Sequence, residues 1–192
     1  MSEFPTQAQV VIIGGGVGGN SIAYHLTKLG WKDVVVLERH ELTSGSTWHS
    51  AGLVGQMRSD ANLTRMMHYS TNLYRELKNE TGQDTGWREV GGVRLACSAE
   101  RMEETKRLVG MARSFGVPME LISPNQAKDL FPLMSLDGVI GAAYTPNDGS
   151  IDPTGLTNAL SIGAKNRGAK FFTNTNVEKI KYQKVGLASV KW

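Results

Sequence analysis

The chain has little cysteine, little proline and no long apolar run. Among its 192 residues there is a single cysteine, Cys97, and there are six prolines. One thiol cannot form an internal disulfide or supply a multi-cysteine metal site, and such a chain suits a reducing compartment. We therefore expect no metal centre. Because Cys97 ends an apolar stretch, we expect it to be a buried strand residue.

The chain also lacks an excess of charge of one sign. It has 21 basic and 18 acidic residues, a formal net charge of +3, and no block of lysine and arginine. This balance does not favour a nucleic-acid or membrane partner. The apolar run Val10–Ile13 is far too short to span a bilayer, and no charged leader precedes it. We expect a soluble protein, in a bacterial-type cytoplasm or in the mitochondrial matrix after removal of a targeting segment.

Glycine is abundant, with 22 residues, and three glycines near the N-terminus form a nucleotide-binding pattern. Gly14, Gly16 and Gly19 follow an apolar strand and satisfy G-x-G-x-x-G. The first allows a tight turn, the second lets the backbone approach a pyrophosphate, and the third lets a helix pack on the sheet. The helix expected from near Val17, with Gly18 in its first turn, directs N–H groups and the positive end of its dipole at the phosphates.

The helix that follows the glycines has an apolar periodicity. Ile22, Leu26 and Leu29 recur at helical spacing, which predicts a helix here. Gly30 is placed to end the helix as its C′ residue.

An acid stands where a dinucleotide site needs one. Glu38 lies 19 residues after Gly19, at the end of the apolar run 34–37, where it can bind ribose hydroxyls. Its charge would repel a 2′-phosphate and so argues against NADP, although the adjacent Arg39 would attract such a phosphate. NAD and FAD both remain open at this point.

A loop rich in serine, threonine and glycine follows and contains one imidazole, that of His49. Eleven residues separate Glu38 from His49, and an extended chain of that length reaches ~35 Å, enough to follow a long cofactor from its ribose to its ring. An ordinary NAD enzyme has a short turn here, so the loop favours FAD. A neutral imidazole, the main form above pH ~6.5, can attack the electrophilic methyl group of a flavin. The alternative is a loop histidine bound to backbone, with the flavin held non-covalently.

The rest of the sequence predicts that the chain leaves the nucleotide-binding fold and later returns to it. Residues 85–145 contain strands at 93–97 and 138–144, an amphipathic helix through 102–112 and a capping-box helix start at Ser123, which suit a substrate-side cap on an antiparallel sheet. Asp152-Pro153 starts another helix that runs to about Arg167. A strand is expected at 170–172, and hairpin strands at 176–182 and 187–192. We therefore divide the chain into a nucleotide-binding part at 1–84, a cap at 85–145 and a return segment at 146–192.

The segment Leu-Thr-Ser-Gly-Ser-Thr-Trp-His-Ser-Ala-Gly-Leu at 42–53 resembles the flavin-linking segment of the sarcosine and dimethylglycine dehydrogenase family. These enzymes belong to the glycine oxidase/D-amino-acid oxidase group of flavoproteins. The similarity continues at 81–82, 86–87, 91–96, 130–133 and 148–153, and so covers nearly all of the chain. The resemblance implies an α/β fold: a Rossmann-like FAD-binding domain (GR2-type) with an inserted α+β substrate-domain segment, C-terminally truncated.

The resemblance also implies a set of cofactor-binding residues. FAD would be bonded through its 8α-methyl group to His49, with Glu38 and Arg39 near the adenosine and Val177 on the adenine side. The residues expected to line the cofactor, besides the glycine loop with Val17, are Gly45, Ser46, Thr47, Trp48, His49, Ser50, Ala51, Gly52 and Leu53.

The implied activity is oxidative demethylation of an N-methylated glycine, dimethylglycine or sarcosine, by hydride transfer to flavin. An electron-transferring flavoprotein would reoxidise a dehydrogenase, and oxygen an oxidase; tetrahydrofolate would act in a further C-terminal region. We expect this chain to be an N-terminal fragment that is inactive alone. We assign no catalytic residue, and we do not assign Arg58, Arg88 or Arg94 to binding of the substrate carboxylate.

Three other functions remain open. Another FAD-dependent amino-acid or glycerol-phosphate oxidoreductase would share the fold. An NAD-dependent dehydrogenase would share the glycine loop. A non-catalytic flavin-binding module is a different class altogether.

Overall fold

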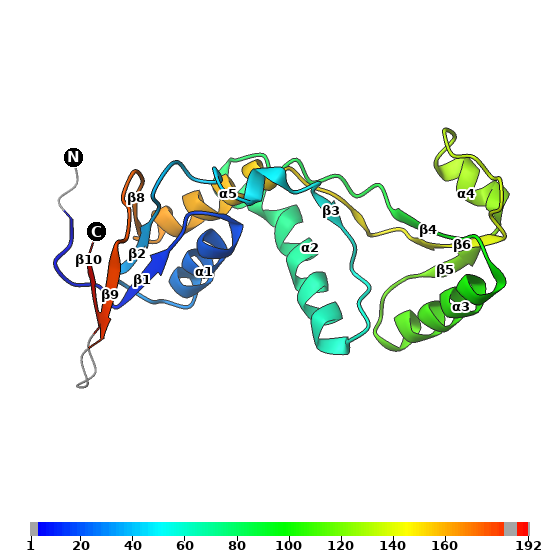
Figure 1. Ribbon diagram of the computed structural model, residues 1–192, viewed down its shortest axis with the longest axis horizontal. Helices are drawn as coiled ribbons and strands as arrows, with labels where there is room; N and C mark the ends of the chain where they lie inside the picture. Colours follow the sequence, from blue (N-terminus) through cyan, green and yellow to red (C-terminus); the bar gives the residue numbers. More distant parts are fainter. Residues whose placement is uncertain (1–3, 183–187, 192) are drawn as a thin grey trace. The chain divides into compact units, whose positions relative to one another are not determined.

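The computed structural model describes residues 4–182 and 188–191. The chain forms two compact units, whose elements are labelled in Figure 1. Unit 1 comprises residues 1–52, 74–86 and 151–192, and unit 2 comprises residues 53–73 and 87–150. Residues 53–73, which we expected in the nucleotide-binding part, group with the cap. Within the described ranges no helix is both long and apolar enough to cross a membrane.

Unit 1 is built on a parallel sheet with the strand order β1-β2-β8. The strands are β1 (Val10–Ile13), β2 (Val34–Leu37) and β8 (Lys170–Phe172), as the sequence predicted. Val10 pairs with Val34, and Val35 pairs with Lys170. All four residues of β2 are buried, which is typical of a central parallel strand covered on both faces. The hairpin expected near the end of the chain is β9 (Lys179–Tyr182) with β10 (Ala188–Lys191); Leu187 and Trp192 lie outside the described residues.

Two helices of unit 1 begin and end where the sequence predicted. Helix α1 (Val17–Lys28) is followed by Leu29 and by Gly30, whose φ is +90°. Helix α5 (Pro153–Asn166) is capped by Asp152, whose carboxylate accepts hydrogen bonds from Thr154 N and Gly155 N. The proline at the first helical position loses no hydrogen bond there, because that N–H has no intrahelical partner.

The apolar residues at helical spacing are not the ones that α1 buries most deeply. Ile22 is 52% and Leu29 78% exposed. The buried residues are Asn20, Ala23, Tyr24 and Thr27. Helix α1 packs closely on α5, and a Cβ atom on Gly163 would lie 2.7 Å from the Tyr24 ring. Such a close approach selects small or hydrogen-bonded residues rather than the most apolar ones.

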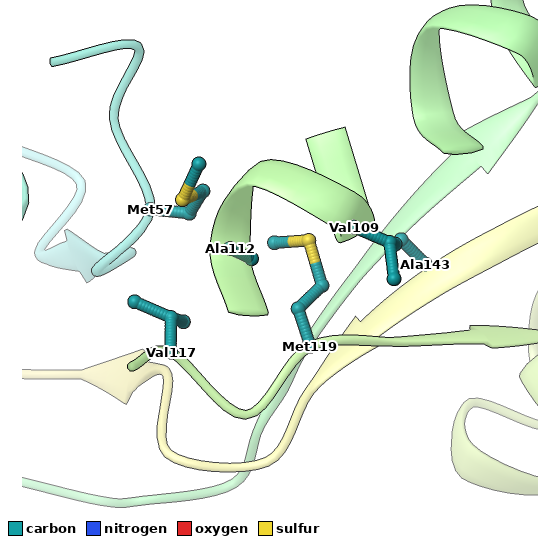
Figure 2. Packing of buried hydrophobic residues seen from close by; sticks show 6 residues of the cluster. All are labelled: Met57, Val109, Ala112, Val117, Met119 and Ala143. Carbon is teal, nitrogen blue, oxygen red and sulfur yellow. The ribbon is translucent and has the colours of Figure 1, made fainter. Parts of the chain in front are cut away.

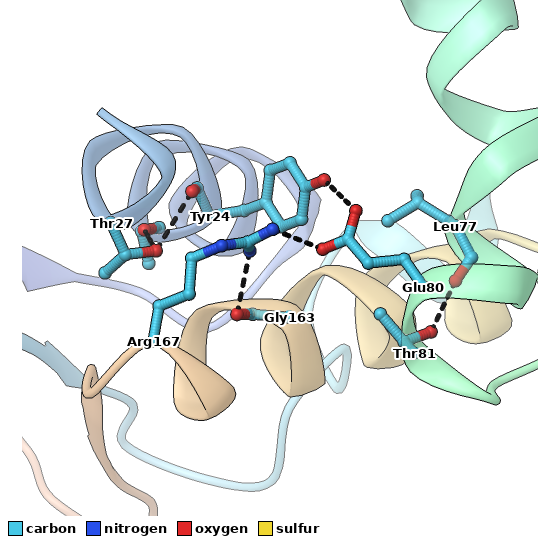
Figure 3. Close-up of polar contacts among 8 residues, drawn as sticks. Tyr24, Thr27, Leu77, Glu80, Thr81, Gly163 and Arg167 are labelled. Atoms are coloured by element: carbon cyan, nitrogen blue, oxygen red, sulfur yellow. Dashed lines mark hydrogen bonds and ion pairs between the residues drawn. The ribbon is translucent and has the colours of Figure 1, made fainter. Parts of the chain in front are cut away.

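A polar network in unit 1 joins α1, the end of α5 and the C-terminal end of a helix that begins in unit 2 (Figure 3). The Tyr24 hydroxyl donates to Glu80 Oε2 over 2.6 Å, at the C-terminal end of α2 (Ala61–Thr81). Arg167, just after α5, pairs with the other oxygen of Glu80 and donates to Gly163 O over 2.9 Å. Burial and the Glu80 carboxylate raise the pKa of Tyr24 to about 12. Desolvation raises the pKa of Glu80, but the hydrogen bonds from Tyr24 and Arg167 outweigh it and lower that pKa.

Unit 2 is built on an antiparallel sheet, with β6 (Gly141–Thr145) between β4 (Gly92–Ala96) and β5 (Glu120–Ile122). Helices α3 (Ala99–Ser114) and α4 (Pro124–Leu130) contact this sheet. A separate pair of strands consists of β3 (Leu53–Val54) and β7 (Gly149–Ser150). The capping box predicted at Ser123 is present, with Gln126 as its partner. The predicted antiparallel sheet of this segment is therefore confirmed.

The core of unit 2 lies between α3 and the sheet. Its buried members are shown in Figure 2: Met57, Val109, Ala112, Val117, Met119 and Ala143. Cys97 does not join any core. It is exposed, because β4 ends at Ala96 and the chain turns there toward α3. The expectation of a buried strand cysteine was wrong.

We expect Tyr24→Phe to lower the stability of unit 1. The variant loses a hydrogen bond to a charged partner, worth about 1.5–3 kcal/mol. The folded-state pKa of Tyr24 lies above its ordinary value of 10.0, so its contribution to the unfolding free energy is complete below pH 10. That contribution is lost as the pH rises through about 12. Thermal melts of the full-length protein at pH 7 and between pH 9 and 11 test this. Tyr144→Phe, at a half-buried tyrosine of β6 (Gly141–Thr145), is the control. Equal losses in the two variants would contradict the role of the network.

Candidate cofactor site

The glycine loop between β1 and α1 has the geometry that the fingerprint requires. Gly14 has a φ of +110°, a left-handed conformation that favours glycine. A Cβ atom on Gly19 would lie 2.0 Å from Gly14 O, so the helix can approach the strand only with glycine there. Gly16, the N-cap of α1, gives no side-chain cap. Apart from the Val17 N–H, which donates to Thr47 Oγ1, the first N–H groups of the helix are therefore presented by bare backbone, as an anion site needs.

Glu38 is tied to the glycine loop. It is half-buried at the end of β2. Its Oε2 accepts from Gly15 N over 2.6 Å, and its Oε1 accepts from His40 N over 2.8 Å. A carboxylate has about four acceptor positions, so both oxygens can still accept from ribose hydroxyls.

A pocket of about 290 Å³ lies beside Glu38. Its lining residues are Ile13, Gly14, Leu37, Glu38, Arg39, Thr175, Asn176 and Val177. The structure thus brings together Gly14, Glu38, Arg39 and Val177, which the sequence placed at the adenosine end. Thr175 and Asn176 are distant from the other lining residues in the sequence. They reach the pocket because β8 lies beside β2 and both strands end at the same edge of the sheet.

The segment with His49 is anchored at the start of α1. It forms a short 3₁₀ turn, η1 (Thr47–His49). Thr47 Oγ1 accepts from Val17 N over 3.0 Å, at the helix N-terminus. A Cβ atom on Gly16 would lie 2.9 Å from that oxygen. The anchor and the glycine loop therefore fit one another closely.

The His49 ring has a defined tautomer in its neutral form. Its Nδ1 lies 3.2 Å from Gly45 O. A carbonyl can only accept, so Nδ1 bears the hydrogen and Nε2 keeps the free lone pair. The Trp48 ring lies against the imidazole, with centroids 3.9 Å apart and an interplanar angle of 34°. Both side chains are exposed.

The far end of the segment is also fixed. Gly52 O accepts from Ile151 N over 2.9 Å, and Gly52 N donates to Ser50 Oγ over 3.3 Å. Gly52 has a φ of +68°, and a Cβ atom there would lie 2.1 Å from Ile151 O. Ser46 and Ala51 are exposed, and Leu53, the first residue of β3, belongs to unit 2.

Two buried polar residues were not predicted from the sequence. Asn20 follows the fingerprint directly and is fully buried; a polar residue on the inner face of a phosphate-binding helix was the signal. Asp148 offered no such signal, because an aspartate before a glycine is typical of any turn.

Asp148 is the centre of a polar cluster in unit 2. It is 6% exposed, and its Oδ1 accepts from Gln56 N over 2.8 Å. A Cβ atom on Gly55 would lie 3.4–3.8 Å from Asp148 Oδ2, Arg58 Nη1 and Arg94 Nη2, so the two cations are near the carboxylate. Burial raises the pKa of Asp148; the Gln56 N–H and the arginines oppose this only in part. Buried charged groups kept at such a cost are frequent at functional sites.

The residues of unit 1 fit a bound dinucleotide. The glycine loop leads into a helix whose N-cap residue gives no side-chain cap, and Gly14 of this loop and Glu38 at the end of the second strand line one pocket. This combination defines a Rossmann-like dinucleotide-binding fold. The family model described as FAD dependent oxidoreductase (DAO) matches residues 9–191, so the chain belongs to this family. The family resemblance and the fold inferred from the sequence are thereby confirmed, and FAD is favoured over NAD.

Individual relatives agree with this assignment. The chain is 43% identical over 178 residues to mitochondrial sarcosine dehydrogenase of Homo sapiens, covering 92% of this chain and 19% of that protein. It is 43% identical over 166 residues to mitochondrial dimethylglycine dehydrogenase of Rattus norvegicus, covering 86% and 19%. The crystal structure of L-proline dehydrogenase from P. horikoshii matches with a TM-score of 0.88 and 33% identity, covering 94% of this chain and 48% of that one. The chain thus spans about a fifth of the length of these curated relatives.

We expect Glu38→Ala in the full-length protein to weaken FAD binding, because it removes a charge-assisted hydrogen bond worth about 1.5–3 kcal/mol. This corresponds to a dissociation constant raised roughly tenfold to a hundredfold. Titration of the flavin-free protein with FAD measures it. Glu38→Gln, which keeps an acceptor oxygen, should lose less. Unchanged affinity in both variants would count against Glu38 as a ribose ligand.

Asp148→Asn and Asp148→Leu should behave differently. Asn keeps an acceptor for Gln56 N and removes a buried charge, so its melting temperature at pH 7 should equal or exceed that of the wild type. Leu leaves the Gln56 N–H unpaired, which costs about 1–3 kcal/mol. Because burial raises the pKa of Asp148, the wild type should gain stability, relative to Asp148→Asn, as the pH falls toward the ordinary value of 3.8. Thermal melts between pH 4 and 7 test this, and a large loss in Asp148→Asn would show that the charge itself stabilises unit 2.

Proposed function

We propose that the protein to which this chain belongs carries out FAD-dependent oxidative demethylation of an N-methylated glycine, sarcosine or dimethylglycine. Two relatives with 43% identity bear the names of dehydrogenases for these substrates. The segment at 42–53 supplies the second support, because it combines a helix-anchored turn with an exposed imidazole.

Different residues of this chain would hold different parts of the cofactor. Glu38 would accept hydrogen bonds from ribose hydroxyls. The N-terminal amides of α1 would bind the pyrophosphate. Arg39 and Val177, which line the pocket, would contact the adenosine end. When bound, FAD supplies the two-electron oxidation of the carbon–nitrogen bond. Besides these residues, the segment Gly45–Leu53 would line the cofactor.

The observation that carries the proposal is the orientation of His49. Its Nδ1–H donates to Gly45 O, so the reactive lone pair is that of Nε2, on an exposed ring. The Thr47 anchor at the start of α1 and the Gly52 contact with Ile151 restrict where the segment can lie. We propose that His49 holds FAD covalently through Nε2.

Other participants follow from the same proposal. The substrate is a small N-methylated amino acid, and the electron acceptor is an electron-transferring flavoprotein. Tetrahydrofolate would take up the one-carbon unit outside residues 1–192. The compartment would be the mitochondrial matrix, as for the two named relatives, or a bacterial-type cytoplasm.

A second candidate is another FAD-dependent amino-acid oxidoreductase. It is favoured by the match to L-proline dehydrogenase, which has a TM-score of 0.88 at 33% identity. Turnover of sarcosine and dimethylglycine against proline and glycerol phosphate separates the two. No turnover of any substrate, with flavin bound, would favour a non-catalytic flavin-binding role.

We expect flavin to remain with the full-length protein after acid precipitation, and His49→Ala to release it into the supernatant. The glycine loop and Glu38 persist in the variant, so it should still bind FAD non-covalently and remain folded, with lower activity. Absorbance of the supernatant and mass spectrometry of the flavin peptide after proteolysis measure this.

His40→Ala is the matched control, since His40 lies in the same loop but only its backbone N–H contacts Glu38. It should keep the flavin in the pellet. Fully extractable flavin in the wild type, or a bond to a residue other than His49, would refute the covalent assignment and leave the FAD fold unaffected.

A further inference from the structure

The Asn20 side chain lies beneath the glycine loop. Asn20 is in the first turn of α1, directly after Gly19, and is 0% exposed. Its Nδ2 donates to Gly15 O over 2.8 Å and to Gly16 O over 2.9 Å. One amide group therefore bridges two consecutive carbonyls of the loop.

These two hydrogen bonds fix the direction of two N–H groups. In a planar trans peptide the C=O and the following N–H point in opposite directions. With Gly15 O held by Asn20, the Gly16 N–H points away from Asn20. Because Gly16 O is held in the same way, the Val17 N–H also points away from Asn20. This N–H donates to Thr47 Oγ1. Glycine has the freedom to turn a peptide over, so this loop needs such a restraint more than most.

The other atom of the same side chain supports a role beyond packing. Asn20 Oδ1 is buried and has no hydrogen-bond partner among the described residues. A buried acceptor without a partner is destabilising, and an apolar residue of similar size would avoid this. The advantage of Asn over an apolar residue is its NH₂ group, which bridges the two carbonyls.

We propose that Asn20 is a positioning residue of the phosphate-binding loop, which holds the Gly16 N–H group toward the diphosphate of the dinucleotide and the Val17 N–H group toward Thr47 Oγ1. This rests on the dinucleotide site proposed above. Each carbonyl has a second donor, since Gly15 O also accepts from Thr43 N and Gly16 O from Asn20 N. Loss of the side chain therefore leaves the loop folded, but each of the two peptides is then restrained by one hydrogen bond instead of two.

The test is Asn20→Leu in the full-length protein with His49→Ala, which makes flavin binding reversible. The dissociation constant of FAD should rise about tenfold, as expected for lost hydrogen-bond restraints. The melting temperature of the flavin-free protein should stay the same or rise, because the unpaired Oδ1 is gone. Asn20→Asp, which sets oxygens against both carbonyls, should bind FAD still more weakly. Thr27→Val, at a buried hydroxyl elsewhere on α1, should leave the affinity unchanged.

A second readout separates positioning from structure. ADP carries the diphosphate and adenosine does not, so Asn20→Leu should weaken ADP binding and leave adenosine binding unchanged. Equal loss for both ligands, unchanged FAD affinity, or a melting temperature that falls in parallel with affinity would overturn the inference. If Glu38→Ala weakens FAD binding and Asn20→Leu does not, only this inference fails. If neither variant does, the proposed site fails as well.

Discussion

The site in unit 1 depends on the hydrogen bond between Gly15 N and the Glu38 carboxylate. It joins the glycine loop after β1 to the end of β2, two segments that meet only because the strands are parallel neighbours. With both Glu38 oxygens held by backbone N–H groups, the carboxylate is oriented before any ligand arrives. Pre-orientation of this kind reduces the entropy lost on binding. The pocket, the Thr47 anchor and the start of α1 are all arranged around this contact.

Local chemistry made much of unit 1 predictable. The strands at 10–13 and 34–37, the Gly30 stop and the Asp152 cap follow from glycine, proline and capping preferences that act within a few residues. Contacts between distant segments were not predictable in this way. Thr175 and Asn176 reach the pocket only through the placement of β8 beside β2.

The buried face of α1 does not follow from its apolar periodicity. Ile22, Leu26 and Leu29 recur at helical spacing, whereas the fold buries Asn20, Ala23, Tyr24 and Thr27. A helix that must approach both a glycine loop and Gly163 of α5 needs small residues and side chains whose polar atoms find partners. The spacing of apolar residues says nothing about how closely a helix approaches its neighbours, so this spacing alone could not identify Asn20 and Tyr24 as buried.

The Gly52 contact with Ile151 makes the segment after Glu38 a closed loop with two fixed ends. Lengthening such a loop is cheap, since doubling its length costs only about 0.6 kcal/mol in closure entropy. Insertions between Arg39 and Gly52 would therefore be tolerated by the fold but would displace His49 relative to α1. The length of this loop therefore determines where His49 lies relative to α1 much more than it determines the stability of the fold.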